Sequence, residues 1–446
     1  MNHDIIRLKE IVLVFSRHGF NYWIENTSLR HHLPFAMKKE PKHLLQVELR
    51  LALEELGPTF VKFGQILSTR PDLVPQDVAS ELEKLQDNVP PFSYSEVCKQ
   101  IEDSFGKKIE DMFKTFDKEP IASASLAQVH HAVLKNGENV AVKVQRPNIH
   151  ESIKEDMHLL VYIAKILDNN HPNDSFSFTE MVEEFKRQLG KELRFDLEAT
   201  HIDQFKENFK HDKDVVIPKV YWDYTNNHIL TMEFIDGVPM NKISESNIND
   251  NSSNTSDINK AKIKLSEKER KLISKRIVDS SLKQVFEYRL FHADPHPGNI
   301  LLLRSKKNMN KIGILDFGSV GTIQEELADN LADLIIAMIS RDTETITEIF
   351  ANIGFSTPHT NLDGMRRDIE DALEGFEDMK ISEVGGTLVR MIQAAKSNNL
   401  KIPHDFILLG KALATMESTA KKINPELNPI KESEPFLRKF VKERWW

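Results

Sequence analysis

The spacing of apolar residues predicts a helical beginning, a short sheet-containing middle and a helical end. Residues 1 to about 115 show apolar faces at helical spacing. Within this part, Gly57-Pro58 begins a further helix, with proline in the first turn, where its missing N–H costs nothing. The helical pattern returns at Gln324 and continues toward the C-terminus.

Between these helical parts, two valine-rich segments at 129–134 and 139–145 predict strands. Asn136-Gly137 lies between them and is the dipeptide most typical of a tight hairpin turn. Further elements follow the same two periodicities. Strands are expected at 228–235, 300–303 and 311–315, and helices at about 148–168, 178–209 and 266–289.

This order of elements predicts an α+β protein with two lobes and a largely helical C-terminal lobe. We expect a helical N-terminal extension over residues 1–116, an N-lobe over 117–236 and a C-lobe over 237–446. An Asn/Ser-rich stretch at about 243–262 has too few apolar residues to offset the entropy of ordering. It is expected to be a mobile insertion.

Composition limits the cellular compartments and the kinds of binding partner that can be expected for this chain. The net charge of −9 argues against nucleic acid as the main partner, because a polyanion requires a basic face. Because Cys98 is the single cysteine, the chain cannot form an intrachain disulfide or a zinc site built on cysteines. This cysteine content fits a protein of a reducing compartment. There is no pattern of a signal peptide and no run of about 20 apolar residues. A cytoplasmic protein is therefore expected.

The stretch from Phe291 to Gly318 carries the candidate chemistry. Asp294 is followed five residues later by Asn299, and Asp316 lies in Ile-Leu-Asp-Phe-Gly. Kinase-type enzymes use this layout: the first Asp orients the acceptor or takes its proton, while Asn and the second Asp hold magnesium on the nucleotide phosphates. ATP and Mg²⁺ are the expected cofactors.

Lys143 ends a Val-Ala-Val-Lys sequence on a predicted strand upstream. Kinases place a lysine in this position to neutralise the α- and β-phosphates of the nucleotide. A single lysine on a strand usually faces solvent. Because Lys143 follows a hairpin and interrupts an otherwise apolar strand, we favour the phosphate-binding role.

The segment 122–129 has the spacing of the kinase glycine-rich loop, with an alanine in place of each glycine. Alanine does not readily adopt positive φ, and its Cβ limits how closely the backbone approaches a phosphate. We expect a stiffer nucleotide loop. The residues predicted to form it are Ala122, Ser123, Ala124, Ser125, Leu126, Ala127 and Val129.

A second motif, Lys62-Phe-Gly-Gln65, lies in the N-terminal extension. Gly64 costs a helix about 1 kcal/mol relative to alanine, which predicts close packing against another backbone. Lys62 on this apolar segment requires a carboxylate partner. Together with the alanine-rich loop, this motif resembles the UbiB (AarF) family of atypical kinase-like proteins, over residues from about 45 to 325.

The segment 191–199 is the third mark of this resemblance. Glu192 and Glu198 match the two glutamates of the family motif and differ by about 120° around a helix. We predict that Glu198 pairs with Lys143 and that Glu192 pairs with Lys62. The sequence departs from the family at Arg194, where an Asp is usual, and at Ala127, where a Gly is usual. The family's carboxylate function is therefore in question at Arg194.

The resemblance implies that the N-terminal extension covers the active site, with Lys62 and Gln65 gating it. It also implies Mg-dependent ATPase activity rather than ordinary protein phosphorylation, and a role in isoprenoid-quinone (ubiquinone-type) or prenyl-lipid biosynthesis at a membrane. The expected partners are therefore a prenyl-lipid or quinone-precursor ligand, and either a second copy of the chain in a homodimer or the other proteins of a biosynthetic complex. Adenine would bind at 232–235, which includes Glu233 and Ile235.

The C-terminal stretch 436–446 mixes basic and aromatic residues, which is typical of a membrane-interface segment. A peripheral or anchored position at the membrane is therefore expected. The other interpretation of this stretch is the end of a solvated helix.

Two other functions remain open. A small-molecule phosphotransferase of the aminoglycoside or choline kinase type would have a similar catalytic loop, but the Lys62 motif and the alanine-rich loop argue against it. A non-catalytic nucleotide- or lipid-binding module would not need Asp294, Asn299 and Asp316 together.

Overall fold

The computed structural model describes residues 2–21, 24, 27, 29, 44–68, 74–85, 90–170, 177–243, 265–303, 310–374 and 384–429, with short pieces between 432 and 440. These residues form two compact units. Unit 1 comprises Met1–Ala199 and Val220–Phe234, and unit 2 comprises Thr200–Lys219 and Ile235–Trp446. The predicted insertion at about 243–262 lies outside the described residues, except for Ile243.

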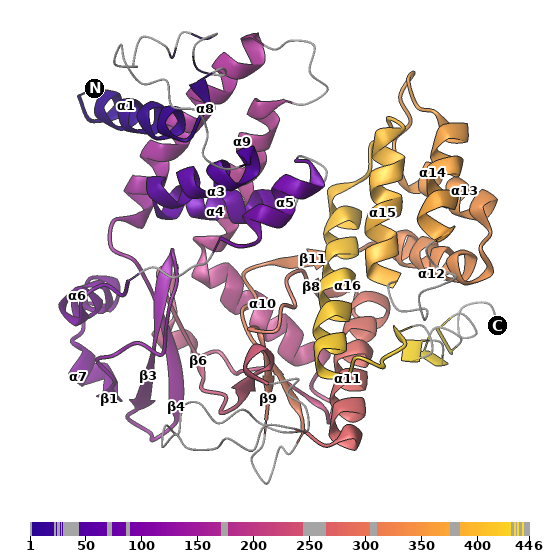
Figure 1. Cartoon of the computed structure of the whole chain (residues 1–446). Coiled ribbons are helices and arrows are strands. Elements are labelled where there is room, and N and C mark those ends of the chain that lie inside the picture. Colours follow the sequence, from indigo (N-terminus) through magenta and orange to yellow (C-terminus); the bar gives the residue numbers. More distant parts are fainter. Residues whose placement is uncertain are drawn as a thin grey trace, which may run out of the picture. The chain divides into compact units, whose positions relative to one another are not determined.

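One part of unit 1 is a helical bundle with a continuous apolar core (Figure 1). The core joins residues from Leu8 to Leu193, so the N-terminal helices and the two helices after the first sheet bury their apolar faces together. The division of the chain at residue 116 stays a prediction. The helices of this bundle are α1 (Asn2–Arg17), α3 (Leu45–Leu56), α4 (Pro58–Ser68), α5 (Gln76–Leu82), α8 (Ile149–Asn170) and α9 (Phe178–Glu192).

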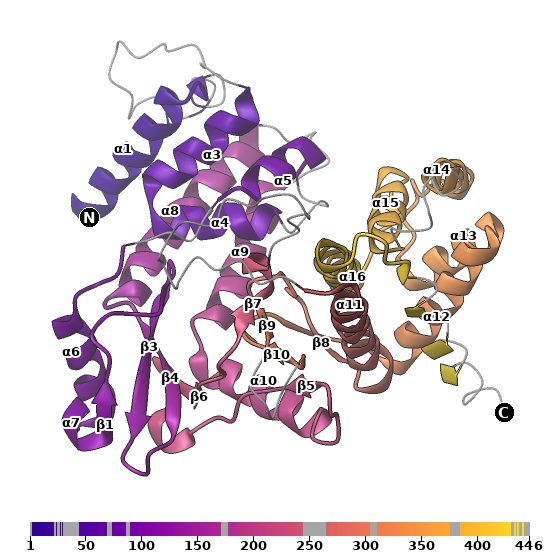
Figure 2. The ribbon, with the colours of Figure 1, turned by 60° about the horizontal axis from the view of Figure 1, so that its bottom comes forward.

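The other part of unit 1 is an antiparallel sheet in the order β1-β3-β4-β6, with β2 paired to β3. Its valine-rich strands pack against Val97 and Ile101 of α6 (Tyr94–Phe105), and α6 and α7 (Ile109–Met112) lie beside β1 in both views (Figure 2). The turn at Asn136-Gly137 forms as predicted, with Gly137 at a φ of 92°. The strands are β1 (Phe113–Phe116), β2 (Ala122–Ser123), β3 (Ala127–Leu134), β4 (Asn139–Gln145) and β6 (Ile229–Glu233).

Unit 2 combines two small sheets with a set of helices. One sheet has the order β5-β10-β9-β7, and β8 pairs with β11 in the other. The strands are β5 (Val215–Val216), β7 (Val238–Pro239), β8 (Leu290–His292), β9 (Ile300–Leu302), β10 (Ile312–Ile314) and β11 (Val320–Thr322). The helices are α11 (Glu267–Leu282), α12 (Glu325–Ser340), α13 (Thr343–Ile353), α14 (Leu362–Glu374), α15 (Val384–Ser397) and α16 (His404–Ile423). The predicted α+β class is confirmed.

Two predicted helices differ from the structure. The helix expected over 178–209 is two helices, because α9 ends at Glu192 and α10 spans Phe195–Asn208. The carbonyl of Leu193 accepts a hydrogen bond from Gln145 Nε2 at 2.8 Å, and the N–H of Phe195 donates to Asn227 O at 3.2 Å. These tertiary bonds replace the helical ones at the break.

The helix expected over about 266–289 forms, but its last turn is π-helical. A capping box at Ser266 begins α11, which ends at Leu282. The π-helical turn η5, Lys283–Glu287, follows it and leads into β8. Such turns are frequent beside functional sites.

Gly64 packs closely, but against side chains and not against the backbone that the sequence predicted. A Cβ there would lie 2.3 Å from Leu85 Cδ1 and 2.8 Å from Leu53 Cδ1. The close approach is real, and leucine side chains of α3 and of the segment after α5 fill the space that a larger residue would need.

Backbone contact of this kind occurs instead between α15 and α16, which run side by side (Figure 1). A Cβ at Gly385 would lie 2.4 Å from the backbone N of Ala414. The Gly385 N–H also donates to Oε2 of the buried Glu417 at 2.8 Å. Glu417 therefore satisfies a free N–H at the start of α15 and fixes where the two helices cross.

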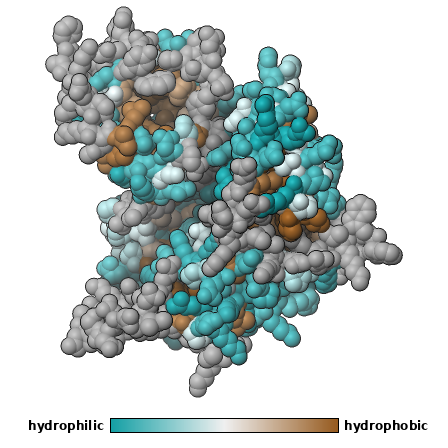
Figure 3. Space-filling view, turned by 45° about the vertical axis from the view of Figure 1, so that its right-hand side comes forward, coloured by the Kyte–Doolittle hydropathy of each residue, from teal (hydrophilic) through white to brown (hydrophobic). Residues whose placement is uncertain are grey.

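None of the helices in the described part of the chain combines the length and the apolar character needed to cross a bilayer. Apolar side chains on the face drawn in Figure 3 appear in small groups among hydrophilic residues. In unit 2 the exposed large apolar residues include Ile336, Ile339, Phe355 and Leu362.

We predict that Gly385→Ala destabilises unit 2 by about 1–3 kcal/mol, because the rigid backbone of Ala414 leaves no room for the added carbon. The matched substitution Gly190→Ala, at an exposed glycine of α9 with no atom within 4 Å of its Cβ position, should stabilise by about 0.5–1 kcal/mol. Urea denaturation with hydrogen exchange in α15 and α16 measures both. Equal stability of the two variants would contradict the packing argument.

Candidate active site

Unit 1 contributes a paired lysine at the middle of its sheet. Lys143 lies in β4 opposite Val129 of β3 and Leu230 of β6, so its backbone is held on both sides. Its Nζ donates to both carboxylate oxygens of Glu198, at 3.0 and 2.9 Å. The Glu198 side chain is 3% exposed and the Lys143 side chain 19%. The predicted Lys143–Glu198 pair is confirmed.

The break between α9 and α10 positions Glu198. Because α10 begins at Phe195, Glu198 falls in its first turn, where a carboxylate interacts favourably with the helix dipole. The Phe195 ring lies 5.1 Å from Lys143 Nζ, within cation–π range. The ammonium group is thus held by a carboxylate and an aromatic face together.

Arg194, the departure from the family pattern, is paired locally. Its Nη2 donates to Asp196 Oδ2 at 2.7 Å, and its Nε lies 3.3 Å from Oδ1. The hydrogen bond from Arg194 lowers the pKa of Asp196 below its usual value. The arginine therefore forms an exposed ion pair at the start of α10.

The second predicted pair also forms. Lys62 Nζ in α4 lies 2.6 Å from Glu192 Oε2 at the end of α9, and both side chains are partly buried. Gln65, one turn along α4, donates from Nε2 to the carbonyl of Leu85 at 3.3 Å. These contacts join α4 to its neighbours within unit 1. The gating role of Lys62 and Gln65 stays a prediction.

The alanine-rich loop is a tight β-hairpin. Ala122 pairs with Val129 across it, and the Ala124 N–H donates to Ala127 O at 2.8 Å. Ser125, Leu126 and Ala127 are buried. The nucleotide contacts of this loop stay a prediction.

Arg146 fixes this loop and was not singled out from the sequence. Its Nε donates to Ala124 O at 3.1 Å, and its Nη2 donates to Ser123 Oγ at 3.2 Å and Pro90 O at 2.8 Å. Its guanidinium also stacks on Phe92, 5.5 Å from the ring centre. The available signal was an arginine placed directly at the end of an apolar strand.

The predicted adenine segment lies where the chain passes from one unit to the other. Unit 1 ends at Phe234, whose N–H donates to Asn139 O at 3.1 Å, and Ile235 belongs to unit 2. Glu233 is the last residue of β6 and pairs with Val140. Adenine binding by Glu233 and Ile235 stays a prediction.

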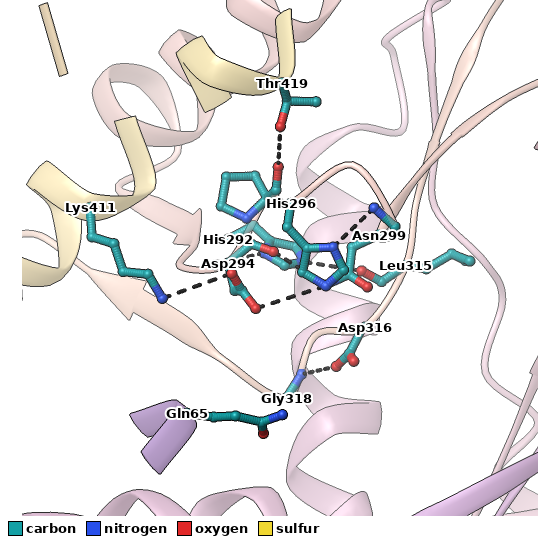
Figure 4. Close-up of polar contacts among 12 residues, drawn as sticks. Gln65, His292, Asp294, His296, Asn299, Leu315, Asp316, Gly318, Lys411 and Thr419 are labelled. Atoms are coloured by element: carbon teal, nitrogen blue, oxygen red, sulfur yellow. Dashed lines mark hydrogen bonds and ion pairs between the residues drawn. The ribbon is translucent and has the colours of Figure 1, made fainter. Parts of the chain in front are cut away.

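Unit 2 contributes the three polar residues of the catalytic motif (Figure 4). Ile300 of β9 pairs with Ile314 of β10, and the Leu315 N–H donates to Asn299 O at 2.9 Å. This antiparallel register places Asn299 opposite Leu315 and next to Asp316. Strand pairing thus brings together two of the residues that the sequence separates.

Asn299 and Asp316 offer hard oxygen ligands. The Asn299 Nδ2 donates to Asp294 O at 3.2 Å, which turns its Oδ1 away as the atom left for a cation. Asp316 has a φ of 57°, an uncommon conformation that Asp tolerates, and its Oδ1 accepts from the Gly318 N–H at 3.3 Å. A carboxylate and an amide oxygen fit Mg²⁺, which takes its other ligands from phosphates and water.

Among the described residues, no group of three or more His, Cys, Asp or Glu could hold a metal ion by itself. A two-oxygen site completed by a nucleotide does not require one. The magnesium assignment of Asn299 and Asp316 stays a prediction.

Asp294 presents a carboxylate with a lysine and a histidine nearby. Its side chain is 41% exposed, and within the described residues no donor hydrogen-bonds to its carboxylate oxygens. Lys411 Nζ lies 3.9 Å from Oδ1, and His296 Nε2 lies 4.0 Å from Oδ2 (Figure 4). The carboxylate is therefore available to accept a hydrogen bond from a hydroxyl or a water.

His292 ties the catalytic loop to the segment that bears Asp316. Its Nδ1 accepts the Asp294 N–H at 3.1 Å, so its Nε2 carries the proton and donates to Leu315 O at 3.0 Å. The His292 N–H itself donates to the buried Gln284 of the π-helical turn at 2.9 Å. Burial lowers the pKa of His292, which keeps the ring neutral.

Sequence reasoning missed the contribution of α16. Lys411 approaches Asp294, and Thr419 Oγ1 donates to Pro295 O at 3.1 Å. More than a hundred residues separate these partners in the chain. A contact between such distant residues leaves no local pattern in a sequence.

Known proteins resemble the chain over most of its length. Residues 84–350 match the ABC1 atypical kinase-like domain, and residues 371–428 match the UbiB helical domain. A "Probable protein kinase UbiB" of Cellvibrio japonicus is 33% identical over 99% of this chain and 78% of its own length. The protein of the same name from Pseudomonas putida strain W619 is 34% identical, over 95% of this chain and 76% of its own length.

A solved structure shows the same kind of fold. Rv3197 of Mycobacterium tuberculosis, determined as a complex with erythromycin, superposes with a TM-score of 0.50. The match covers 84% of this chain and 94% of that one, at 20% sequence identity.

We predict a pH dependence of stability that involves His292. Because burial lowers its pKa, the unfolded chain binds a proton here that the folded chain does not, and the free energy of unfolding falls as pH decreases below about 6.5. Burial also lowers the pKa of His130 and of His150, so both residues contribute to the same fall in stability at lower pH.

The substitution His292→Gln keeps an N–H donor for Leu315 O and removes the titrating ring. It should reduce the slope of unfolding free energy against pH by up to about 1.4 kcal/mol per pH unit. Urea denaturation at a series of pH values between about 7 and 5 measures it. A variant with the wild-type slope would show that His292 does not contribute.

Proposed function

Since the chain belongs to the UbiB family of ABC1 atypical kinase-like proteins, we propose that it is a magnesium-dependent ATPase or phosphotransferase. Its activity would support isoprenoid-quinone (ubiquinone-type) or prenyl-lipid biosynthesis at a membrane surface. The observation that supports the catalytic part is that kinase-type residues are held by specific contacts within each unit. Unit 1 holds the Lys143–Glu198 pair, and unit 2 holds Asp294, Asn299 and Asp316.

Lys143 would bind the α- and β-phosphates of ATP. Glu198 accepts hydrogen bonds from Nζ through both carboxylate oxygens, which would orient the ammonium group toward the phosphates. The hairpin at 122–129 would cover the phosphates with backbone N–H groups, and Arg146 would limit its movement. Adenine would contact the backbone around Glu233 and Ile235.

Asn299 and Asp316 would hold magnesium. When bound, Mg²⁺ neutralises charge on the nucleotide phosphates. The protein's own task is to present two oxygens in fixed directions. Two hydrogen bonds do this: Asn299 Nδ2 donates to Asp294 O, and the Gly318 N–H donates to Asp316 Oδ1. His292 holds the two supporting segments together.

Asp294 would orient the acceptor. An exposed carboxylate to which no donor in the described part of the chain hydrogen-bonds can accept a hydrogen bond from a water molecule or an alcohol. With water as the acceptor the reaction is ATP hydrolysis. With the hydroxyl of a prenyl-lipid or a quinone precursor it is phosphoryl transfer. Lys62 and Gln65 of the extension would restrict access to larger substrates.

The membrane part of the proposal rests on family resemblance and on the C-terminal stretch 436–446, which is basic and aromatic. Two of its aromatic rings, Phe436 and Phe440, lie 6.2 and 5.0 Å from Phe286 of the π-helical turn. The proposed location is the cytoplasmic face of a membrane.

The test is ATP turnover with and without Mg²⁺, in the presence and absence of anionic lipid vesicles that contain a quinone-precursor mimic. We expect Asp316→Asn to reduce turnover at least about 100-fold, because a ligand charge is lost. Asn tolerates the φ of 57° and still accepts the Gly318 N–H, so the fold should be kept.

The control is Asp371→Asn, which removes one exposed carboxylate from α14 and should keep wild-type turnover. Wild-type turnover in Asp316→Asn would refute the magnesium assignment. ATP binding without turnover under any condition would favour the non-catalytic module. Phosphate on a soluble alcohol would favour the small-molecule phosphotransferase.

A further inference from the structure

Helix α16 lies outside the part of the chain that matches the kinase-like domain, yet it contacts the catalytic loop. The kinase-like match ends at residue 350, and α16 falls within the UbiB helical domain at 371–428. Thr419 Oγ1 donates to Pro295 O at 3.1 Å, and Lys411 Nζ lies 3.9 Å from Asp294 Oδ1 (Figure 4). The helical domain therefore reaches the candidate catalytic residue directly.

Packing within unit 2 fixes the position of this helix. Thr419 is buried, and its one hydroxyl proton is shared between Pro295 O and Thr415 O of α16. Gly410, beside Lys411, allows a close approach of α15, since a Cβ there would lie 2.8 Å from Ile392 Cδ1. Glu417 accepts the Gly385 N–H from α15. Lys411 thus projects from a helix held on two sides.

The catalytic loop itself contains no permanent cation. The stretch from Phe291 to Ile300 has no Lys or Arg, and His296 is charged only when protonated. Phosphoryl transfer spreads negative charge over the transferred group, and its catalysis depends on fixed positive charge at that point. Within unit 2, Lys411 brings such a charge to Asp294.

Lys411 and Asp294 lie near each other without a direct hydrogen bond. A separation of 3.9 Å between Lys411 Nζ and Asp294 Oδ1 exceeds a charge-assisted hydrogen bond of about 2.7–2.9 Å. An oxygen beside the pair can accept from the ammonium group, while the acceptor hydroxyl donates to the carboxylate. With side chains 26% and 41% exposed, the pair itself contributes little to folding.

We propose that Lys411 is a further catalytic residue of the phosphoryl-transfer centre, supplied by the helical domain, and that its ammonium group stabilises the charge on the transferred phosphoryl group. The inference rests on the proposed function. In the step, the bond between the terminal phosphorus of ATP and the bridging oxygen breaks, and the electron pair leaves with ADP. A bond forms from the acceptor oxygen, whose proton passes to Asp294. Lys411 keeps its proton throughout.

The test compares Lys411→Met, Lys411→Arg and the control Lys422→Met by steady-state ATP turnover and by calorimetric ATP binding. Lys422 is an exposed lysine of the same helix, so its variant removes the same charge away from the loop. We expect Lys411→Met to lower kcat at least about 10-fold, with KM and Kd for ATP within about twofold. Lys411→Arg should retain more activity than Lys411→Met.

Wild-type kcat in Lys411→Met would overturn the inference, and so would equal losses in the Met and Arg variants accompanied by a lower melting temperature, which would indicate a structural role. These results are distinct from failure of the proposed function. If the wild-type protein shows no Mg-dependent turnover, both ideas fail. If wild type and Lys422→Met turn over ATP and Lys411→Met does so equally well, only the inference fails.

Discussion

The ion pair between Lys143 and Glu198 is the constraint on which the organisation of unit 1 depends. A carboxylate that is 3% exposed requires compensation, because an unpaired buried charge costs several kcal/mol. Meeting that requirement places the first turn of α10 against β4. Gln145 and Asn227 hydrogen-bond to the backbone at the break between α9 and α10. Because of this break, α10 starts at Phe195 and Glu198 falls in its first turn.

In unit 2 the corresponding constraint is strand register. The pairing of Ile300 with Ile314 sets Asn299 beside Asp316, and His292 fastens the loop that carries Asp294 to Leu315. Hydrogen bonds to the backbone thus position the segments that carry Asn299, Asp294 and Asp316. Helix α16 then adds the charge that the loop lacks.

The sequence predicted those features of the fold and of the candidate site that residues close together in the chain determine. Lys62 on an apolar segment required a carboxylate partner, and the family resemblance supplied the two predicted pairs, Lys62–Glu192 and Lys143–Glu198, both of which form. The hairpin at Asn136-Gly137 and the start of α4 at Pro58 follow from the conformational preferences of those residues. The α+β fold and the family follow from these elements and motifs.

What the sequence did not predict depends on contacts between distant segments. The break between α9 and α10 is made by Gln145 and Asn227, so helical periodicity alone predicted one helix. Gly64 packs against leucines of two other segments, and Lys411 meets Asp294 across more than a hundred residues. Such contacts become visible only when the chain is folded.

The central claim is that the Lys143–Glu198 pair and a magnesium ion hold ATP in a kinase-type centre. Calorimetric titration of ATP into the full chain, with and without Mg²⁺, tests it most directly when wild type is compared with Lys143→Met. The account predicts magnesium-dependent binding that weakens about 10-fold or more in Lys143→Met, since a buried charge-assisted contact is lost. Equal affinity of the two proteins, or binding indifferent to Mg²⁺, would contradict it.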